Sequence, residues 1–340
     1  MSHEQYMNQC FDLAKKAQGE VSPNPLVGCV IVKDDKVIAT GYHKGSGLDH
    51  AELDAIKNAT ETLQGATLYS NLEPCCHTDK KTPPCAQRII SEGISKVVIS
   101  NLDPNPKVSG SGVQLLKDAK IEVVIDILKN KGLKLNEIFF THIVQKRPFI
   151  HIKYAQTLDG KLATTSGHSK WITSESSRTH VHENRSLYDA ILIGGSTLVK
   201  DDPKLTIRLN GQESCKKRVV LLNRKLEDKN YKLFTDQYKD KTITIDHDQK
   251  LDMSQIMDTL YNEYAIKSLY IEGGSKTIGL FLEQNLFDKI SVYIAPKILG
   301  LGSSVLSDKV SKMISDGLEF QDISWDVIAQ DVVLTAYRKD

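Results

Sequence analysis

The stretch from residue 50 to residue 85 constrains the fold most, because it sets soft metal ligands at fixed points of the chain. It reads HAE at 50–52, LEPCCH at 72–77 and TPPC at 82–85. One imidazole and two thiolates suit zinc, and three protein ligands leave a fourth position open. We therefore expect His50, Cys75 and Cys85 to bind one zinc ion, with each motif at the start of a helix.

Glu52 follows the histidine by two residues and is better placed to move protons than to be a fourth ligand. A zinc site of this kind with an adjacent glutamate is typical of deaminases, in which the glutamate is the general acid and base. Cys76 is a rival for the second cysteine ligand, but Cys75 is favoured because it directly follows a proline. The pattern predicts hydrolytic deamination of an amidine-like ring carbon.

The segment between the two cysteine motifs is long and carries charge. It places His77, Lys80 and Lys81 beside the expected metal, where they could help to bind an anionic substrate. The alternative is a closed structural zinc site with His77 as the fourth ligand, joined to a nucleotide-binding sensor. Such a site would have no use for Glu52.

Composition limits the partners and the compartment. The chain has 340 residues, enough for two domains, and its net charge of +1 argues against nucleic acid as a partner. Six cysteines show no disulfide spacing, which indicates reduced thiols and a cytoplasmic protein. No apolar run has membrane-spanning length and no leader is apparent. We expect a small-molecule substrate, no nucleic-acid or membrane partner, and a homo-oligomer.

Strands alternate with helices along the first part of the chain, which favours a layered α/β domain. A lysine-rich apolar stretch, 128–147, is expected to be a helical connector, and the pattern restarts at Arg147. This divides the chain into domains at 1–146 and 147–340. We expect strands in the first domain at 26–32, 67–71, 97–100 and 121–125, and helices from 50, from 84 and at 112–119.

The second domain is expected to contain its own sheet, with a polar helix at 174–185. Its predicted strands lie at 149–155, 190–193, 218–222, 242–245, 268–271, 290–295 and 332–337. Two glycine-containing turns, 194–197 and 273–275, follow strands and could cradle phosphate through backbone amides. Neither matches the glycine pattern of a Rossmann fold, and each is as readily a tight turn.

The motifs of both halves together resemble those of the bifunctional riboflavin-biosynthesis deaminase/reductase family. In the first half these are PNPLVG at 23–28, HAE at 50–52, LEPC at 72–75, TPPC at 82–85 and DPNP at 103–106. In the second half they are TLDGK at 157–161, SKWIT at 169–173, DDP at 201–203 with Leu205 and Arg208, and EGG at 272–274. The resemblance covers nearly the whole chain, although the metal loop is one residue longer than the usual family spacing.

The resemblance implies an N-terminal cytidine-deaminase-like three-layer α/β/α domain and a C-terminal dihydrofolate-reductase-like α/β domain. It implies one zinc ion per chain and NADPH as cofactors. The implied reactions are deamination of 2,5-diamino-6-(5-phosphoribosylamino)pyrimidin-4(3H)-one and NADPH-dependent reduction of its ribosyl group, giving 5-amino-6-(5-phosphoribitylamino)uracil.

Carried over position by position, the resemblance assigns roles to individual residues. In the first domain it implies His50, Cys75 and Cys85 as zinc ligands, Glu52 as proton shuttle, and Asn24, His43, Asp103 and Asn105 as substrate contacts. In the second it implies substrate contacts at Ser169, Arg185, Leu205, Arg208 and Glu272, and cofactor contacts at Ala155, Trp171, Thr197, Asp201 and Gly274. Lys153 and Glu272 are expected to be catalytic, polarising the opened sugar carbonyl and managing its proton; the alternative is a structural salt bridge.

The turn Asn223-Arg224-Lys225 bears on cofactor choice. In dinucleotide sites an acidic residue at a strand end favours a ribose 2′-hydroxyl, whereas a nearby arginine accepts a 2′-phosphate. Here the predicted strand 218–222 ends in a neutral amide followed by two cations, although family members usually have aspartate there. We therefore expect Arg224 to contact the 2′-phosphate and NADPH to be preferred over NADH; a solvated basic turn is the alternative.

Overall fold

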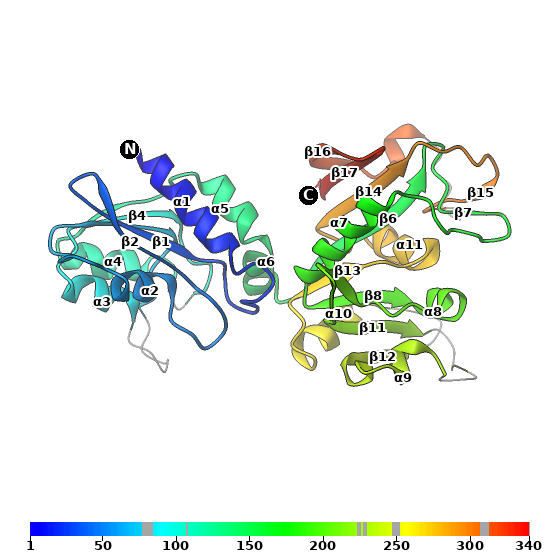
Figure 1. Cartoon of the computed structure of the whole chain (residues 1–340), viewed down its shortest axis with the longest axis horizontal. Helices are drawn as coiled ribbons and strands as arrows, with labels where there is room; N and C mark the ends of the chain where they lie inside the picture. Colours follow the sequence, from blue (N-terminus) through cyan, green and yellow to red (C-terminus); the bar gives the residue numbers. More distant parts are fainter. Residues whose placement is uncertain are drawn as a thin grey trace. The chain divides into compact units, whose positions relative to one another are not determined.

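The computed structural model divides the chain into two compact units, Met1–Lys146 and Arg147–Asp340 (Figure 1). It describes residues 1–76, 84–106, 108–222, 226, 230–246, 252–306 and 313–339. Each unit has its own sheet and its own hydrophobic cores, so each is an α/β domain.

The first unit alternates strands and helices along almost its whole length. Its elements are α1 (His3–Lys15), β1 (Gly28–Lys33), β2 (Lys36–Tyr42), α2 (Ala51–Lys57), β3 (Thr67–Leu72), α3 (Cys85–Ser91), β4 (Lys96–Asn101), α4 (Ser111–Asp118), β5 (Glu122–Val124), α5 (Lys129–Leu135) and α6 (Glu137–Gln145). The five strands form one sheet in the order β2-β1-β3-β4-β5. β1 runs antiparallel to β2 and β3, whereas β3, β4 and β5 are parallel.

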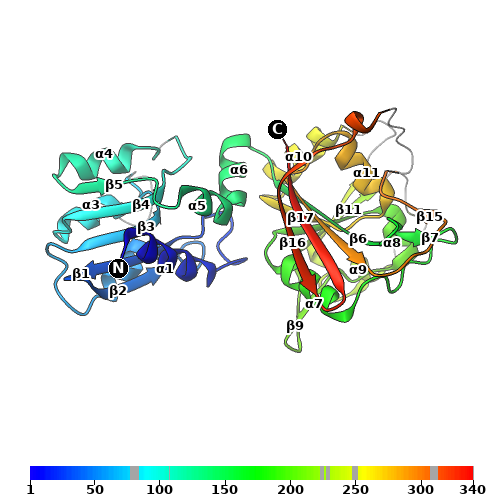
Figure 2. The same cartoon turned by 90° about the horizontal axis from the view of Figure 1, so that it is seen from above.

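Helices cover both faces of this sheet, as the views in Figures 1 and 2 show. Alternate residues of β1 point to opposite faces. Cys29 and Ile31 pack in a core with α2, α3 and α4, while Val30 and Val32 pack against α1 and, at its margin, α5. Burial on both faces explains why the strand is apolar throughout rather than alternating. The three-layer α/β/α fold is confirmed.

The second unit is built on a larger mixed sheet. Its elements are β6 (Phe149–Thr157), β7 (Ala163–Thr164), α7 (Glu175–Ser186), β8 (Ala190–Gly194), α8 (Gly195–Asp201), β9 (Ile207–Leu209), β10 (Gln212–Ser214), β11 (Lys217–Leu222), α9 (Lys232–Thr235), η1 (Lys239–Lys241), β12 (Thr242–Asp246), α10 (Met253–Asn262), β13 (Ser268–Ile271), α11 (Ser275–Glu283), β14 (Lys289–Ala295), β15 (Gly302–Ser303), η2 (Ile314–Asp316), β16 (Phe320–Ile328) and β17 (Asp331–Arg338).

Eight of these strands form the sheet in the order β12-β11-β8-β13-β6-β14-β17-β16. The first six are parallel, and β17 and β16 add antiparallel strands at one edge. Leu192 of β8 packs in the core that contains α10 and α11, whereas its neighbours Ile191 and Ile193 pack with α8 and α9. This arrangement agrees with the dihydrofolate-reductase-like class expected for the second domain.

Two differences from the sequence-based expectations stand out. β16 was not predicted, although Ile323, Trp325 and Val327 alternate with polar residues along it; seven of its nine residues are exposed because the strand lies at the edge of the sheet. The connector expected as one helix over 128–147 is two helices, α5 and α6, that meet at Asn136. Asn136 is buried, and its side chain forms hydrogen bonds with the backbone of Leu26. The helix is interrupted at this residue.

Among the residues described, no helix is both long and apolar enough to cross a membrane.

Candidate active sites

Three possible metal ligands converge in the first unit. His50 is the residue before α2, Cys85 is the first residue of α3, and Cys75 lies in the irregular segment after β3. His50 Nδ1 lies 3.5 Å from Cys75 Sγ and 3.4 Å from Cys85 Sγ. The expectation that every motif opens a helix was wrong for Cys75, because the next described helix begins only at Cys85.

The donor set fits zinc. Tetrahedral bonds of about 2.3 Å to sulfur and about 2.0 Å to nitrogen would separate the two donor atoms by roughly 3.5 Å. Both nitrogen-to-sulfur distances agree with that value. The backbone N–H of Cys85 also donates to Cys75 Sγ at 3.4 Å, a contact that favours a thiolate at Cys75. Among the described residues the ligand cluster comprises His50, Cys75 and Cys85, and Cys76 does not belong to it.

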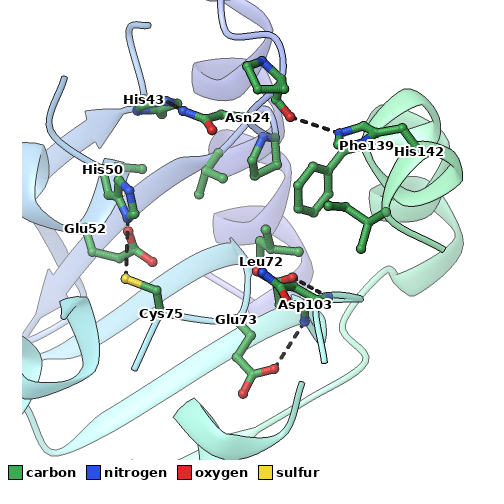
Figure 3. A pocket seen from close by; sticks show the side chains of 16 residues that line it. Asn24, His43, His50, Glu52, Leu72, Glu73, Cys75, Asp103, Phe139 and His142 are labelled. Carbon is green, nitrogen blue, oxygen red and sulfur yellow. Dashed lines mark hydrogen bonds between the residues drawn. The ribbon is translucent and has the colours of Figure 1, made fainter. Parts of the chain in front are cut away.

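Glu52 lies in the first turn of α2, beside this cluster, and only 4% of its surface is exposed (Figure 3). Burial raises the pKa of Glu52 above its ordinary value, while the neighbouring His50 opposes that shift. A carboxyl group with a raised pKa accepts a proton more readily than an exposed one, as a general base must. Glu52 lines the same pocket as His50 and Cys75.

The remaining expected residues of the first domain line this pocket as well. Asn24, His43, Asp103 and Asn105 all face it. The Asn24 side-chain amide donates to His43 Nε2 at 3.1 Å, and His43 Nδ1 donates to the carbonyl of Asp49 at 2.9 Å. These two partners fix the orientation of the imidazole. Figure 3 shows Asn24 and His43 side by side, with Phe139 and His142 of α6 across the pocket.

A buried carboxylate fixes the loops around the pocket. Glu73 accepts backbone N–H groups from Asp103 at 3.1 Å, Gly110 at 3.0 Å and Val113 at 3.0 Å. It therefore ties the end of β3 to the loop after β4 and to the start of α4. Sequence reasoning assigned Glu73 no role, because a glutamate that holds three distant amides has no local pattern.

Two buried amides hold the segment that carries Asn24. Asn71 accepts from the backbone N–H of Gly28 at 2.7 Å and donates to the carbonyl of Leu26 at 2.9 Å. Asn136 binds both backbone groups of Leu26, at 2.8 and 2.9 Å. The wall of the pocket is thus fixed by side chains that do not face it.

A second pocket lies in the other unit, where β6, β8 and β13 end. It is lined by the expected residues Lys153, Ala155, Ser169, Thr197, Asp201, Glu272 and Gly274. The carboxyl ends of parallel strands with adjacent helix starts are the usual place for a ligand in an open α/β sheet. Seven expected residues, spread over 122 positions of sequence numbering, are thereby brought together.

Lys153 and Glu272 occupy equivalent positions on neighbouring strands. The register pairs Ile152 with Ile271, so the following residues, Lys153 and Glu272, lie side by side. Burial lowers the pKa of the Lys153 ammonium, and the charge of Glu272 opposes that shift. Burial alone would raise the pKa of Glu272, but Arg185 and Lys153 outweigh it and hold that pKa below its ordinary value. Each charge thus favours the ionised form of the other.

Arg185 from α7 clamps the glutamate. Its Nη2 donates to Glu272 Oε2 at 3.1 Å, its Nε donates to Oε1, and its Nη1 donates to the carbonyl of Thr206 at 2.7 Å. The backbone N–H of Arg208, two residues further, donates to His182 Nδ1 at 3.3 Å. Burial, Arg185 and Arg208 together lower the pKa of His182 to about 4. Arg185 and Arg208 therefore give this corner of the unit positive charge, part of which Glu272 balances.

The two glycine-containing turns that could cradle phosphate meet in the folded unit. The backbone N–H of Gly274 donates to Thr197 Oγ1 at 3.1 Å. A Cβ added at Gly194 would lie 2.2 Å from Thr277 Oγ1, and one at Gly273 would lie 2.6 Å from Thr277 Cβ. Both glycines are required because α11 approaches these turns closely.

Four expected contacts do not line the pocket: Arg185, which reaches it only through Glu272, and Trp171, Leu205 and Arg208. Trp171 is 65% exposed and stacks on Arg178, whose guanidinium carbon is 4.5 Å from the ring centroid. Leu205 is 4% exposed and its side chain packs in the core with α8 and α9, so only its backbone is available. Arg208 is exposed on β9.

The expectations for His77, Lys80 and Lys81, and for Asn223, Arg224 and Lys225, fall outside the described residues.

Family matches agree with the two pockets. Residues 1–101 match the cytidine and deoxycytidylate deaminase zinc-binding region, and residues 148–334 match the RibD C-terminal domain. The "Riboflavin biosynthesis protein RibD" of Aquifex aeolicus is 40% identical over 351 residues, covering 97% of this chain and 96% of that protein. Its Escherichia coli counterpart is 35% identical over 329 residues, covering 88% and 89%.

Solved structures of the family have the same fold. Acinetobacter baumannii RibD, 33% identical, superimposes with a TM-score of 0.91 over 99% of both chains. A diaminohydroxyphosphoribosylaminopyrimidine deaminase/5-amino-6-(5-phosphoribosylamino)uracil reductase from Thermotoga maritima, 38% identical, gives the same score and coverage.

Fold and site together define a two-domain enzyme in which a zinc-dependent deaminase precedes an NADPH-dependent reductase. The chain belongs to the RibD family of bifunctional riboflavin-biosynthesis enzymes.

Proposed function

We propose that residues 1–146 deaminate 2,5-diamino-6-(5-phosphoribosylamino)pyrimidin-4(3H)-one and that residues 147–340 reduce the deaminated product. The observation that carries this proposal is the cluster of His50, Cys75 and Cys85 with a buried Glu52 in the same pocket. A structural zinc site would not need an ionisable glutamate facing a cavity. The neighbouring reductase unit accounts for the rest of the chain.

In the deaminase pocket, His50, Cys75 and Cys85 would hold a zinc ion, which would supply a Lewis acid to activate a water molecule. Glu52 would take one proton from the attacking water and pass it to the neighbouring ring nitrogen. It would then carry the remaining hydroxyl proton to the amino nitrogen, which would leave as ammonia while the carbonyl forms. The low exposure of Glu52 keeps this proton from exchanging with bulk solvent.

Polar groups around the pocket suit the ring and sugar of the substrate. Asn24 and His43 form one hydrogen-bonded unit and would contact the pyrimidine. Asp103 and Asn105 lie on the loop that Glu73 holds and would contact the phosphoribosyl group. Asp103 Oδ1 accepts the backbone N–H of Asn105 at 2.8 Å, and this contact fixes the position of its carboxylate in the pocket.

In the reductase pocket, NADPH supplies the hydride for C1′ of the opened ribosyl group. Lys153 would donate the proton to the heteroatom doubly bonded to C1′, so that the bond becomes saturated. Glu272 compensates the lysine charge and is itself held by Arg185. Ser169, the backbone of Leu205, and Arg208 would contact the substrate, where the positive corner near His182 suits its phosphate.

The cofactor is proposed to lie against Ala155, Thr197, Asp201 and Gly274, with Trp171 at its margin. The contact between Thr197 and the amide of Gly274 supports a phosphate position between the two turns. Arg224 as the 2′-phosphate contact stays a prediction, as does the NADPH preference that rests on it.

The deciding experiment is Glu52→Gln in the full chain. Loss of a general acid/base should slow deamination about 10²–10⁴-fold. Zinc content should remain at one per chain, and reduction of supplied deaminated intermediate should be unchanged. Glu61→Gln, the same substitution at an exposed glutamate shortly after α2, is the matched control. Equal loss of both activities in a folded Glu52→Gln protein would contradict the division at residue 147.

We further propose that the protein is a cytoplasmic homo-oligomer that binds neither nucleic acid nor membranes. All six cysteines are free thiols, which suits a reducing compartment. β16 is an edge strand whose Ile323, Trp325 and Val327 share one exposed face, and edge strands of this kind readily pair with a second copy. Trp325→Glu should shift the molar mass measured by light scattering toward the monomer, whereas Asp326→Ala should leave it unchanged. Equal masses for both variants would place the interface elsewhere.

A further inference from the structure

Both proposed catalytic residues of the reductase lie beneath α7, and α7 is a polar helix. Its buried side chains include Ser177 and Val181, while several of its polar side chains also point at the sheet. Arg185 binds Glu272 directly. Between α7 and Lys153 lies an aromatic residue of β14, Tyr293, which contacts both.

The Tyr293 ring lies against the lysine. Lys153 Nζ is 5.4 Å from the ring centroid, within the range of a cation–π contact. Within the described part of the chain no carboxylate lies within salt-bridge distance of this ammonium, and no side chain there makes a hydrogen bond with it. Glu272 acts on Lys153 through its charge rather than through a direct bond. Lys153 lines the reductase pocket, so its N–H groups are available to a substrate there.

Tyr293 itself is held in place by α7. Its side chain is 1% exposed, and its Oη lies 2.9 Å from His180 Nδ1. Asn184, one helical turn after His180, donates to the same oxygen at 3.4 Å. Two α7 residues at i and i+4 thus fix the hydroxyl, while the ring presents its face to Lys153.

We propose that Tyr293 is a positioning residue of the reductase: its ring holds the Lys153 ammonium without occupying any of that group's hydrogen-bond donors. A carboxylate in the same place would bind those donors and compete with the substrate for them. This inference rests on the proposed proton-donating role of Lys153.

The test compares Tyr293→Leu, which removes the ring, with Tyr293→Phe, which keeps the ring and removes only the hydroxyl. We expect kcat of reduction to fall about tenfold in the leucine variant and to stay within about twofold in the phenylalanine variant. KM for NADPH and the deamination rate should be unchanged in both. Equal losses in the two variants, or full turnover in Tyr293→Leu, would overturn the inference.

The pH profile of kcat provides a readout that a purely structural role would not move. The ammonium of Lys153 faces Tyr293 from β14, Glu272 from β13 and Arg185 from α7. Without the ring its charged form is less stabilised, so the basic limb of the profile should move to lower pH in Tyr293→Leu and stay in place in Tyr293→Phe. An unmoved limb in the leucine variant would count against the inference even if that variant is slow.

Lys153→Met separates this inference from the proposed function. Its reduction should be nearly abolished with NADPH binding retained. Full turnover by Lys153→Met would refute the proton-donating role itself, whereas a slow Lys153→Met beside a fast Tyr293→Leu would refute only the positioning role. If Tyr293→Leu does not fold, Tyr293→Phe still tests the inference. A reduction rate in Tyr293→Phe as low as that in Lys153→Met would refute the positioning role of the ring.

Discussion

The two pockets are held together in different ways. Around the deaminase pocket, uncharged amides and one carboxylate bind backbone groups, and these contacts fix the loops that carry residues such as Asn24 and Asp103. In the reductase pocket, charged residues sit on the strands themselves and balance one another beneath a single helix. The geometry of the deaminase pocket depends on hydrogen bonds that fix the backbone. The geometry of the reductase pocket depends on pairing between charged side chains. Substitutions should therefore damage them differently.

The largest loss of activity is expected when a zinc ligand of the deaminase is replaced. Cys85→Ser should remove zinc and slow deamination at least about 10³-fold, more than the 10–100-fold typical of residues outside the ligand shell. Zinc content measured by elemental analysis and deamination rates check this. Cys76→Ser is the matched control. Its zinc content and its deamination rate should stay within about twofold of those of the unaltered protein. Retained zinc in Cys85→Ser, or its loss in Cys76→Ser, would change the ligand assignment.

The charge-paired unit should respond most strongly to loss of its buried arginine. Arg218 is fully buried; it binds both oxygens of Asp236 at 2.7 and 2.9 Å and donates to the carbonyls of Lys204 and Leu233. Arg218→Met removes these hydrogen bonds and leaves the Asp236 carboxylate without its counter-charge, so it should lower the free energy of unfolding by about 3–5 kcal/mol.

Urea unfolding followed by circular dichroism measures this change. The control is Lys339→Ala, which removes the exposed ion pair with Glu319 and should cost at most about 1 kcal/mol. Similar costs for both variants would show that the buried network is no more important than a surface pair.

A smaller, pH-dependent effect is expected from His151, which is buried between Tyr188 and Ser291. Burial holds the pKa of His151 well below its ordinary value of 6.5. As pH falls below about 6.5, the unfolded chain binds a proton that the folded unit does not, so stability decreases until the pH reaches the lower folded pKa. Between pH 7 and pH 5 the loss from this group is about 2 kcal/mol.

His151→Gln keeps polar atoms for both neighbours and removes the titration. Urea unfolding at pH 7 and pH 5 should therefore show a smaller difference between the two pH values than in the unaltered protein. A difference of undiminished size would mean that other groups govern the acid sensitivity.

The deaminase site was predictable because its chemistry needs uncommon residue types. One histidine and two cysteines in order, with Glu52 nearby, restrict the possibilities even before folding is considered. The fold class followed from strands that are apolar throughout, such as β1, and from the helices between them. Glu73 and Asn136 were not predicted, because a glutamate or an asparagine is ordinary and its role depends on backbone groups far away in sequence.

The reductase residues were predicted through the family motifs rather than from pattern. Nothing local marks Lys153 or Glu272, since a charged residue in a strand is as often a salt bridge. Tyr293 had no signal at all, because its role depends on contact with another strand and with α7. Leu205 shows the limit of transfer by motif: its position is shared with the family, but its side chain belongs to the core.

The attachment of Glu73 has a consequence for how this chain can vary in length. Glu73 fixes the backbone just before Cys75, and the N–H of Cys85 contacts Cys75 Sγ at the start of α3. Both ends of the intervening loop are thus set by contacts outside the loop, so residues can be gained there without moving the ligands. A metal loop one residue longer than the usual family spacing is compatible with this arrangement.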